Sequence, residues 1–260
     1  MNTPTHTHPD VSIALLTWNR KSYLEKGLPK MFANLSKSLR HEILIMDNAS
    51  VDGTLEYVRQ FAGHREVRIV ANAKNLKFKG YNRLFGMAKG DTIIELDDDV
   101  IDFPRDFDRI LHESLAVFPE FGFVALDTVK NEKTDGGWPG CSDPSKTTVR
   151  GGLAMTEGPA KGYCAAFRRR DYSIIRPFTF FFPFSLSKPQ DYVVSGLIRR
   201  LLRKKSGILD GIKCLHANGP IYAEEFGRLD FDRMKLLESD CRERLSEYES
   251  ALENRQIYSP

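Results

Sequence analysis

Short apolar runs alternate with segments of helical spacing along the first half of the chain. Hydrophobic runs at residues 11–16 and 42–46 predict strands that are buried on both faces, and residues 67–71 and 92–96 predict a third and a fourth strand. Between them, apolar residues recur three and four positions apart, which predicts helices over 21–39, 55–61 and 78–88, with a break or kink at Pro29. This alternation is typical of a doubly wound α/β domain, so we expect a mostly parallel central sheet flanked by helices.

The second half of the chain carries shorter signals. A helix over 107–118 and a strand over 121–126 continue the alternation. Residues 130–152 are rich in Gly, Asp, Lys, Thr and Pro and predict a long loop, of a length that in compact domains is usually functional or mobile. Residues 224–252 combine helical apolar spacing with many charges, which predicts an outer helix or a subunit contact.

Composition narrows the class of protein. The 260 residues are 41% hydrophobic and 28% charged, which excludes wholesale disorder and collagen-like repetition. The 38 basic and 35 acidic residues leave a net charge of +3, too small an excess to predict a nucleic-acid partner.

Cysteine usage and the ends of the chain bear on location. The four cysteines include no C-x-x-C pair and predict free thiols in a reducing compartment, so we expect a cytoplasmic protein. The polar residues 1–10 show no signal peptide, and the apolar stretch 178–186 is too short to span a membrane.

Three consecutive aspartates, Asp97, Asp98 and Asp99, follow the fourth predicted strand. Adjacent carboxylates repel one another unless a hard cation or hydrogen-bond donors compensate, so this triplet predicts a divalent-cation site. A solvated acidic turn is the alternative. Because alternate residues of an extended segment point the same way, Asp97 and Asp99 are expected to face one site.

Polar residues also follow the first two predicted strands. Thr17, Asn19 and Arg20 end the first, and Asp47 ends the second. Because the carboxyl ends of parallel strands meet at one edge of the sheet, we expect these side chains to hold a ligand with a base and a sugar. A turn that caps the next helix is the alternative for Asp47.

The segments VSIALLTWNR from Val11, IMDNASVDGT from Ile45 and ELDDD from Glu95 resemble, in order and spacing, the family 2 glycosyltransferases of GT-A fold. Residues 75–91 are similar to a further pattern of that family, with Lys77 and Leu84 where the pattern has glycine. The resemblance implies a single GT-A, Rossmann-like α/β domain with a C-terminal helical segment. Its expected parts are a flexible N-terminus (1–10), a nucleotide-sugar-binding half (11–128), an acceptor and catalytic-base half (129–220) and a helical extension (221–260).

The resemblance also implies roles for particular residues. The implied metal ion is Mg²⁺ or Mn²⁺, held by Asp99 and by His216, which ends the segment Cys-Leu-His; a structural histidine is the alternative. The implied donor-binding residues are Thr17, Asn19, Arg20, Asp47, Asn48, Gly80, Asn82, Asp97 and Asp98.

Pro189-Gln190-Asp191 resembles the acidic motif, usually Glu-Asp, that opens a helix in this family and supplies the general base. Asp191 is therefore the implied catalytic residue, with a simple helix N-cap as the alternative. Gln190 replaces the first acid, so any assistance from a second carboxyl is missing or is replaced by amide hydrogen bonds. If Asp191 only caps the helix, Glu157 and Asp171 are the next candidates.

The implied reaction is a metal-dependent, inverting transfer of a sugar from a nucleoside diphosphate sugar, of the UDP type, to a hydroxyl of a glycan or lipid-linked acceptor in cell-surface polysaccharide biosynthesis. A sugar-phosphate nucleotidyltransferase and a non-catalytic nucleotide-sugar-binding subunit are the alternatives. The first needs a Gly-rich phosphate loop, and Thr17 to Arg20 contain no glycine.

Two neighbouring segments bear on a contact with a membrane. The basic amphipathic segment 197–205 and the nearby apolar residues 178–184 predict an ordinary exposed face, or a peripheral contact with the inner face of a membrane. The sequence does not determine the donor sugar, the acceptor or the oligomeric state.

Overall fold

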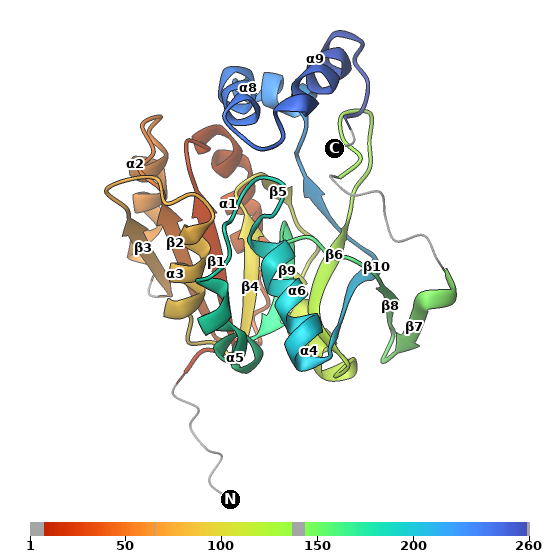
Figure 1. The fold of residues 1–260 in the computed structure, drawn as a ribbon. Coiled ribbons are helices and arrows are strands. Elements are labelled where there is room, and N and C mark those ends of the chain that lie inside the picture. The colour runs from red at the N-terminus through yellow and green to blue at the C-terminus, as the bar shows by residue number, and fades with distance from the viewer. Residues whose placement is uncertain (1–7, 65, 137–143, 259–260) are drawn as a thin grey trace, which may run out of the picture.

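The computed structural model describes residues 8–64, 66–136 and 144–258, in which ten strands form one sheet (Figure 1). The strand order is β3-β2-β1-β4-β9-β6-β10-β8-β7, and β5 pairs with β10 outside this path. The strands are β1 (Val11–Thr17), β2 (His41–Asp47), β3 (Val67–Ala71), β4 (Thr92–Asp97), β5 (Val100–Asp102), β6 (Phe121–Thr128), β7 (Thr147–Arg150), β8 (Leu153–Glu157), β9 (Cys164–Arg168) and β10 (Lys205–His216).

The first four strands confirm the predicted parallel sheet. Strand β1 pairs in parallel with both β2 and β4, with Thr17 opposite Asp47 and Leu16 opposite Asp97. Their polar ends therefore meet at one edge, as the apolar runs predict. Strand β9 lies antiparallel between β4 and β6, and β10 runs parallel to β6.

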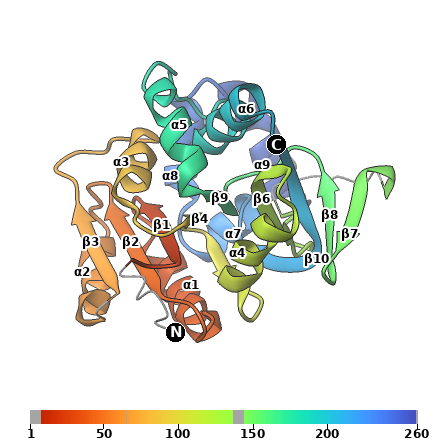
Figure 2. The same cartoon turned by 90° about the horizontal axis from the view of Figure 1, so that it is seen from below.

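Helices cover both faces of the sheet. Figure 2 shows α3, α5 and α6 on one side and α1, α2 and α4 on the other. The helices are α1 (Lys21–Asn34), α2 (Thr54–Arg59), α3 (Lys79–Met87), α4 (Phe107–Val117), α5 (Arg169–Thr179), α6 (Gln190–Leu202), α7 (Pro220–Glu225), α8 (Leu229–Leu237) and α9 (Leu245–Glu253), with 3-10 turns η1 (Gln60–Gly63), η2 (Pro144–Lys146) and η3 (Arg242–Arg244).

Two predicted elements differ from the structure. Helix α1 continues through Pro29 and ends at Asn34 rather than at residue 39, because Leu35 takes an extended conformation. The segment 130–152 is not loop throughout: Thr147–Arg150 forms the edge strand β7 against β8, while residues 137–143 lie outside the described chain. A four-residue edge strand is too short for its apolar pattern to stand out.

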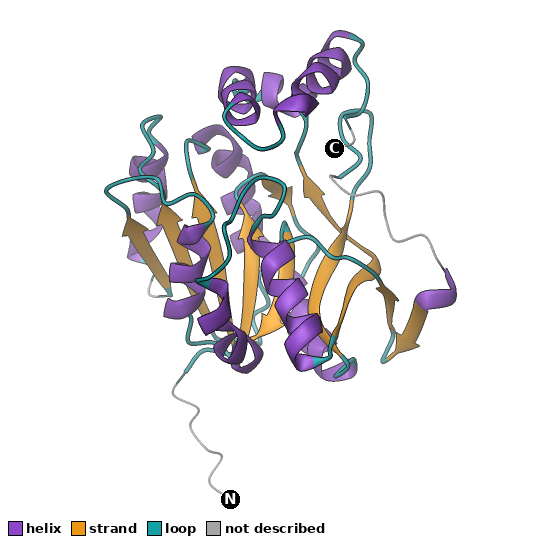
Figure 3. Cartoon of the chain, viewed as in Figure 1, coloured by secondary structure: helices purple, strands orange, loops and turns teal. Residues whose placement is uncertain are grey.

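The C-terminal part confirms the predicted helical extension but is divided into short helices. Gly227, at a positive φ of 68°, ends the turn after α7 and turns the chain into α8. Ala223, Leu236, Cys241 and Tyr248 form a small core there, separate from the main core of the sheet. In Figure 3 these helices lie beyond the carboxyl ends of the parallel strands, so they roof that edge. None of the described helices has the length and the apolar character needed to cross a bilayer.

Candidate functional site

A cavity of about 440 Å³ lies at the carboxyl edge of the sheet. Strand β4, the segment before β9, the start of α6, the end of β10 and the C-terminal extension all contribute to its wall. Its titratable lining includes Glu95, Asp97, Lys161, Asp191, His216 and Arg244. Acidic and basic groups from distant parts of the sequence therefore converge on one space.

The aspartate triplet lies where β4 turns into β5. Asp97 accepts a hydrogen bond from the Tyr81 hydroxyl at 2.9 Å. Asp98 accepts one from the backbone N–H of Trp18 at 3.3 Å. Asp99 lies opposite the end of β10, where its Oδ1 is 3.0 Å from Nε2 of His216. The three carboxylates are thus held by different partners, and Asp97 and Asp99 face the same side as predicted.

Asp97, Asp99 and His216 form a cluster suited to a divalent ion. One ligand atom of each residue lies within 4.8 Å of the others. Nδ1 of His216 lies 3.0 Å from the carbonyl oxygen of Gly136, so an Nδ1–H donates there and Nε2 faces the carboxylates. Two carboxylates and one imidazole nitrogen are a donor set that Mn²⁺ and Mg²⁺ accept. The residues therefore fit the predicted metal site, with Asp97 joining the pair that the sequence indicates.

The electrostatics of this cluster compensate for its burial. Burial and the neighbouring Asp99 together raise the pKa of Asp97 to about 7, although His216 opposes the shift. Burial alone would lower the pKa of His216, but the carboxylate of Asp99 raises it to about 9. The same ion pair holds the pKa of Asp99 below its usual value despite burial. Without a metal ion, the imidazolium therefore supplies the positive charge that the carboxylates require.

Residues at the ends of β1 and β2 lie beside the triplet as predicted. Thr17 and Asp47 are buried and opposite one another in the parallel register. Asp47 Oδ2 accepts a hydrogen bond from the Ser50 N–H, whereas its Oδ1 is buried without a partner in the described residues. An unsatisfied buried carboxylate oxygen is costly, so Asp47 is poised to accept a hydrogen bond from a ligand.

Arg20 contacts the triplet directly. Its guanidinium lies 3.5 Å from both Asp98 and Asp99, and the Arg20 side chain is buried. Asn19 serves the local structure instead, because its Oδ1 accepts a hydrogen bond from the Val51 N–H at 2.7 Å. Both residues therefore lie at the predicted edge, but Asn19 also ties β1 to the loop after β2.

Three predicted donor-binding residues are engaged elsewhere. Asn48 binds the segment 72–77 through both its amide and its carbonyl groups. Gly80 allows α3 to approach β1, since a Cβ there would lie 2.6 Å from Cδ1 of Leu16. Asn82 is buried and accepts a hydrogen bond from Gln190 at 2.8 Å. These residues shape the wall behind the site.

Asp191 lies in the cavity wall at the start of α6. It is the second residue of that helix, and Pro189 occupies the N-cap position, so a simple N-cap is not its place. Its Oδ2 accepts a hydrogen bond from the Gly162 N–H and its Oδ1 one from the Tyr192 N–H, both at 2.8 Å. Burial raises the pKa of Asp191 although these donors lower it. A fixed carboxylate with a raised pKa is suited to accept a proton.

The two alternative bases lie outside the cavity lining. Asp171 is buried against the ammonium group of Lys204, and Glu157 pairs with Lys205. Both carboxylates are thus neutralised by lysines at the other end of the sheet.

Glu95 is a cavity residue that the sequence patterns did not single out. It is only 2% exposed, and its Oε2 has no hydrogen-bond partner among the described residues. It flanks the same backbone as Asp191, because a Cβ on Gly162 would lie 2.7 Å from the Glu95 carboxyl and 2.8 Å from Cβ of Asp191. Burial, then Asp191, raises its pKa well above the usual value. A charged residue inside an apolar strand was the signal available in the sequence.

The C-terminal extension adds residues that no local pattern identified. Arg228 donates a hydrogen bond to the carbonyl oxygen of Asn19, and Asp232 lies 3.7 Å from Arg20. Phe231 packs edge-on against Trp18, with ring centroids 6.3 Å apart. The extension therefore fixes the tip of β1 from the opposite side of the cavity.

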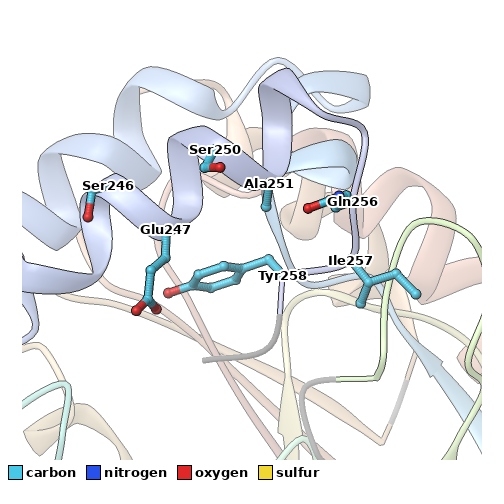
Figure 4. A pocket seen from close by; sticks show the side chains of 7 residues that line it. All are labelled: Ser246, Glu247, Ser250, Ala251, Gln256, Ile257 and Tyr258. Atoms are coloured by element: carbon cyan, nitrogen blue, oxygen red, sulfur yellow. The ribbon is translucent and has the colours of Figure 1, made fainter.

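A second hollow, of about 430 Å³, lies between α9 and the end of the described chain (Figure 4). Its titratable lining residues are Glu247 and Tyr258, and none of the described residues that line it carries a positive charge. It therefore lacks the groups that would bind a phosphate or a metal together with its counter-charge.

Comparison with known proteins agrees with the predicted resemblance. Residues 12–173 match the family described as Glycosyl transferase family 2. Over 130 residues the chain is 28% identical to EpsE of Bacillus subtilis, a protein assigned to the glycosyltransferases; the match covers 44% of this chain and 46% of that protein. It is 29% identical over 133 residues to an undecaprenyl-phosphate 4-deoxy-4-formamido-L-arabinose transferase of Pseudomonas savastanoi, covering 49% of this chain and 38% of the relative. The chain thus matches less than half of the length of these relatives.

Solved structures share the fold. A mannosyltransferase of Pyrobaculum calidifontis, solved with GDP-mannose and Mn²⁺, superposes with a TM-score of 0.59 at 18% identity, covering 100% of this chain and 68% of that one. Residues 1–349 of TarS from Staphylococcus aureus, solved with UDP-GlcNAc, give a TM-score of 0.55 at 16% identity, covering 95% and 72%. At these identities the likeness shows the fold alone.

Proposed function

The chain belongs to glycosyl transferase family 2, and from that premise we propose that it catalyses metal-dependent, inverting transfer of a sugar from a nucleoside diphosphate sugar to an acceptor hydroxyl. One observation carries the proposal: Asp97 and His216, which form a cluster with Asp99, line the same cavity as Asp191. Family membership favours glycosyl transfer over the nucleotidyltransferase alternative. A base that lines the cavity argues against a subunit that only binds nucleotide sugar.

The donor side of the cavity is the edge formed by β1, β2 and the triplet. Asp47 has a buried carboxylate oxygen without a hydrogen-bond partner in the described residues. We assign this oxygen to accept a hydrogen bond from the base or the ribose of the nucleotide. Asp97, Asp99 and His216 would hold Mg²⁺ or Mn²⁺, which when bound stabilises the negative charge of the leaving diphosphate. Relatives of the same fold support this choice, since one was solved with a nucleotide sugar and Mn²⁺.

The acceptor side is the wall formed by α6 and the segment before β9. Asp191 accepts the proton of the acceptor hydroxyl. At the same time the acceptor oxygen forms a bond to the anomeric carbon, and the bond between that carbon and the leaving diphosphate breaks. The backbone N–H groups of Gly162 and Tyr192 orient the carboxylate. Burial raises its pKa in spite of these hydrogen bonds, and the raised pKa favours proton uptake. Displacement from the face opposite the leaving group inverts the anomeric configuration.

The proposed acceptor group is a hydroxyl of a glycan or of a lipid-linked sugar. Glycans and lipid-linked sugars both present hydroxyls, and one relative is named as an undecaprenyl-phosphate 4-deoxy-4-formamido-L-arabinose transferase. We assign a UDP-type donor and an acceptor of cell-surface polysaccharide assembly, which includes lipid-linked acceptors.

The proposal is tested by screening nucleoside diphosphate sugars against the full chain. Thermal unfolding with each sugar nucleotide, with and without Mn²⁺, identifies the donor, and the anomeric configuration of the transferred sugar is then read by NMR. A donor that stabilises the protein only with the metal ion and yields an inverted product is expected. Metal-independent transfer, or retention of configuration, would contradict the proposal.

A further inference from the structure

The hairpin of α5 and α6 exposes an unusual amount of apolar surface. Of the twelve large hydrophobic side chains that are exposed in the described residues, seven lie between residues 174 and 201. Phe181 is 83% exposed and Phe180 64% exposed. Six of these residues, five of them aromatic, are called the aromatic surface: Ile174, Phe178, Phe180, Phe181, Phe182 and Tyr192. A cluster of exposed apolar side chains on a solvent-facing surface usually marks a binding site.

The same hairpin concentrates positive charge. Residues 169–205 contain nine Lys and Arg against two Asp, leaving 29 basic and 33 acidic residues in the rest of the chain. Both aspartates are withdrawn from the surface charge: Asp171 is buried against Lys204, and Asp191 lines the cavity. The chain is therefore nearly neutral overall but carries a strongly basic face.

Several of these basic residues have no carboxylate within 4 Å in the described part of the chain. The group consists of Arg176, Lys188, Arg199, Arg200 and Arg203, all of them exposed. Unpaired cations beside exposed aromatic rings are the composition of interfacial membrane-binding elements, because rings enter the headgroup boundary while cations meet anionic lipids.

A groove connects this face with the active-site cavity. Phe182, Arg199 and Arg200 line the groove together with Tyr192 and Ser195. The last two, with Pro159, also line the cavity that holds Asp191. Figure 2 shows α5 and α6 side by side on one face of the sheet. A molecule held in the groove would therefore lie next to the cavity that Asp191 lines.

We propose that the aromatic surface and the arginines of α6 dock on an anionic lipid bilayer, with the rings in the headgroup boundary and the guanidinium groups at lipid phosphates. A second copy of the chain is disfavoured because two such basic faces would repel each other in a symmetric dimer. Docking does not require sugar transfer. Delivery of a lipid-linked acceptor through the groove is the part that rests on the proposed function.

The test is co-sedimentation of the full chain with vesicles of phosphatidylcholine alone or with 30% phosphatidylglycerol added. The chain is expected to bind the anionic vesicles on the order of tenfold more tightly, with affinity falling as salt rises. The double variant Arg199→Gln/Arg200→Gln and the double variant Phe180→Ser/Phe181→Ser should each lower the partition coefficient about tenfold or more.

Matched controls remove similar groups elsewhere. Lys37→Gln/Arg59→Gln and Val51→Ser/Val149→Ser replace exposed cations and exposed apolar residues outside the hairpin, and they should leave vesicle binding unchanged. Thermal unfolding checks that each variant is folded. Nucleotide binding with Mn²⁺, measured separately, reports on the proposed function and not on docking.

Equal binding to neutral and anionic vesicles, or equal loss in the control variants, would overturn the proposal. So would a dimer that the Phe180→Ser/Phe181→Ser variant dissociates, since the surface would then serve self-association. Absence of vesicle binding together with tight binding of a single-stranded RNA oligonucleotide would reassign the basic face to nucleic acid.

Discussion

Nε2 of His216 lies 3.0 Å from Oδ1 of Asp99, although one residue ends β10 and the other follows β4. Strand β5 makes this contact possible by turning back from the triplet to pair with the end of β10, with His216 opposite Val100. The Ala217 N–H donates to the carbonyl oxygen of Asp99 at 2.8 Å and holds the two segments together. The candidate metal site is therefore a property of this strand pairing.

Asp99→Asn should abolish metal-dependent nucleotide binding. The amide keeps the shape but removes the negative charge that a divalent cation requires. Isothermal titration with UDP or GDP and Mn²⁺ would show binding lost in the variant, and excess EDTA should have the same effect on the unmodified chain. Asp230→Asn, on an almost fully exposed side chain of α8, is the control and should bind normally. Unchanged affinity in EDTA would count against the metal assignment.

His216 should make the metal-free protein less stable at alkaline pH. Its pKa is about 9 in the folded chain against an ordinary value near 6.5, so the folded state binds its proton more tightly. The resulting stabilisation, about 1–3 kcal/mol, is complete below about pH 6.5 and is lost as the pH rises through about 9. Urea unfolding in EDTA from pH 6 to pH 10 measures this slope.

His216→Gln should flatten the slope in that window, whereas His64→Gln, on an exposed side chain, should not. A slope that is unchanged in His216→Gln would show that another group titrates.

Asp191→Asn should lower the turnover of sugar transfer by roughly 10² to 10⁴-fold while nucleotide affinity is retained. The amide oxygen can still accept a hydrogen bond from Gly162, so the fold should persist. Steady-state kinetics, nucleotide titration and thermal unfolding measured together distinguish the roles. Near-normal transfer with a small loss of stability would assign Asp191 to the helix terminus instead.

Glu95→Gln should gain stability relative to the unmodified chain as the pH rises above about 4.5. Burial and the nearby Asp191 raise the pKa of Glu95 in the folded state, so ionisation above its unfolded pKa disfavours folding. The amide has no such ionisation. Denaturant unfolding at pH 5 and pH 8 checks the direction, with Glu56→Gln on the exposed face of α2 as the control. An equal difference at the two pH values would contradict a buried, proton-binding Glu95.

Gly27→Ala should destabilise the protein by about 1–3 kcal/mol, because overpacking forces backbone to move. A Cβ at Gly27 in α1 would lie 2.4 Å from the carbonyl oxygen of Val100, at the start of β5. Gly196→Ala in α6 is the matched control, since nothing lies within 4 Å of its Cβ position. It should instead stabilise by about 0.5–1 kcal/mol through helix propensity. Equal effects of the two changes would show that α1 does not press on β5.

The sequence by itself determined the fold of the N-terminal half, where strands and helices alternate regularly. Hydrophobic runs predicted the strands β1 to β4, and their alternation with helices placed Thr17, Asp47 and Asp97 at one edge. That inference works because a parallel sheet built from crossover units leaves few arrangements for its strands.

Only the tertiary structure decided how distant segments bring the groups of the site together. Strand β9 inserts antiparallel beside β4, β10 reaches β5, and the extension brings Arg228 and Asp232 to the tip of β1. Glu95 and Asp191 meet across Gly162 for the same reason. Hydrophobic spacing reports only which face of an element is buried, whereas these contacts depend on register between segments far apart in the chain, which no local pattern encodes.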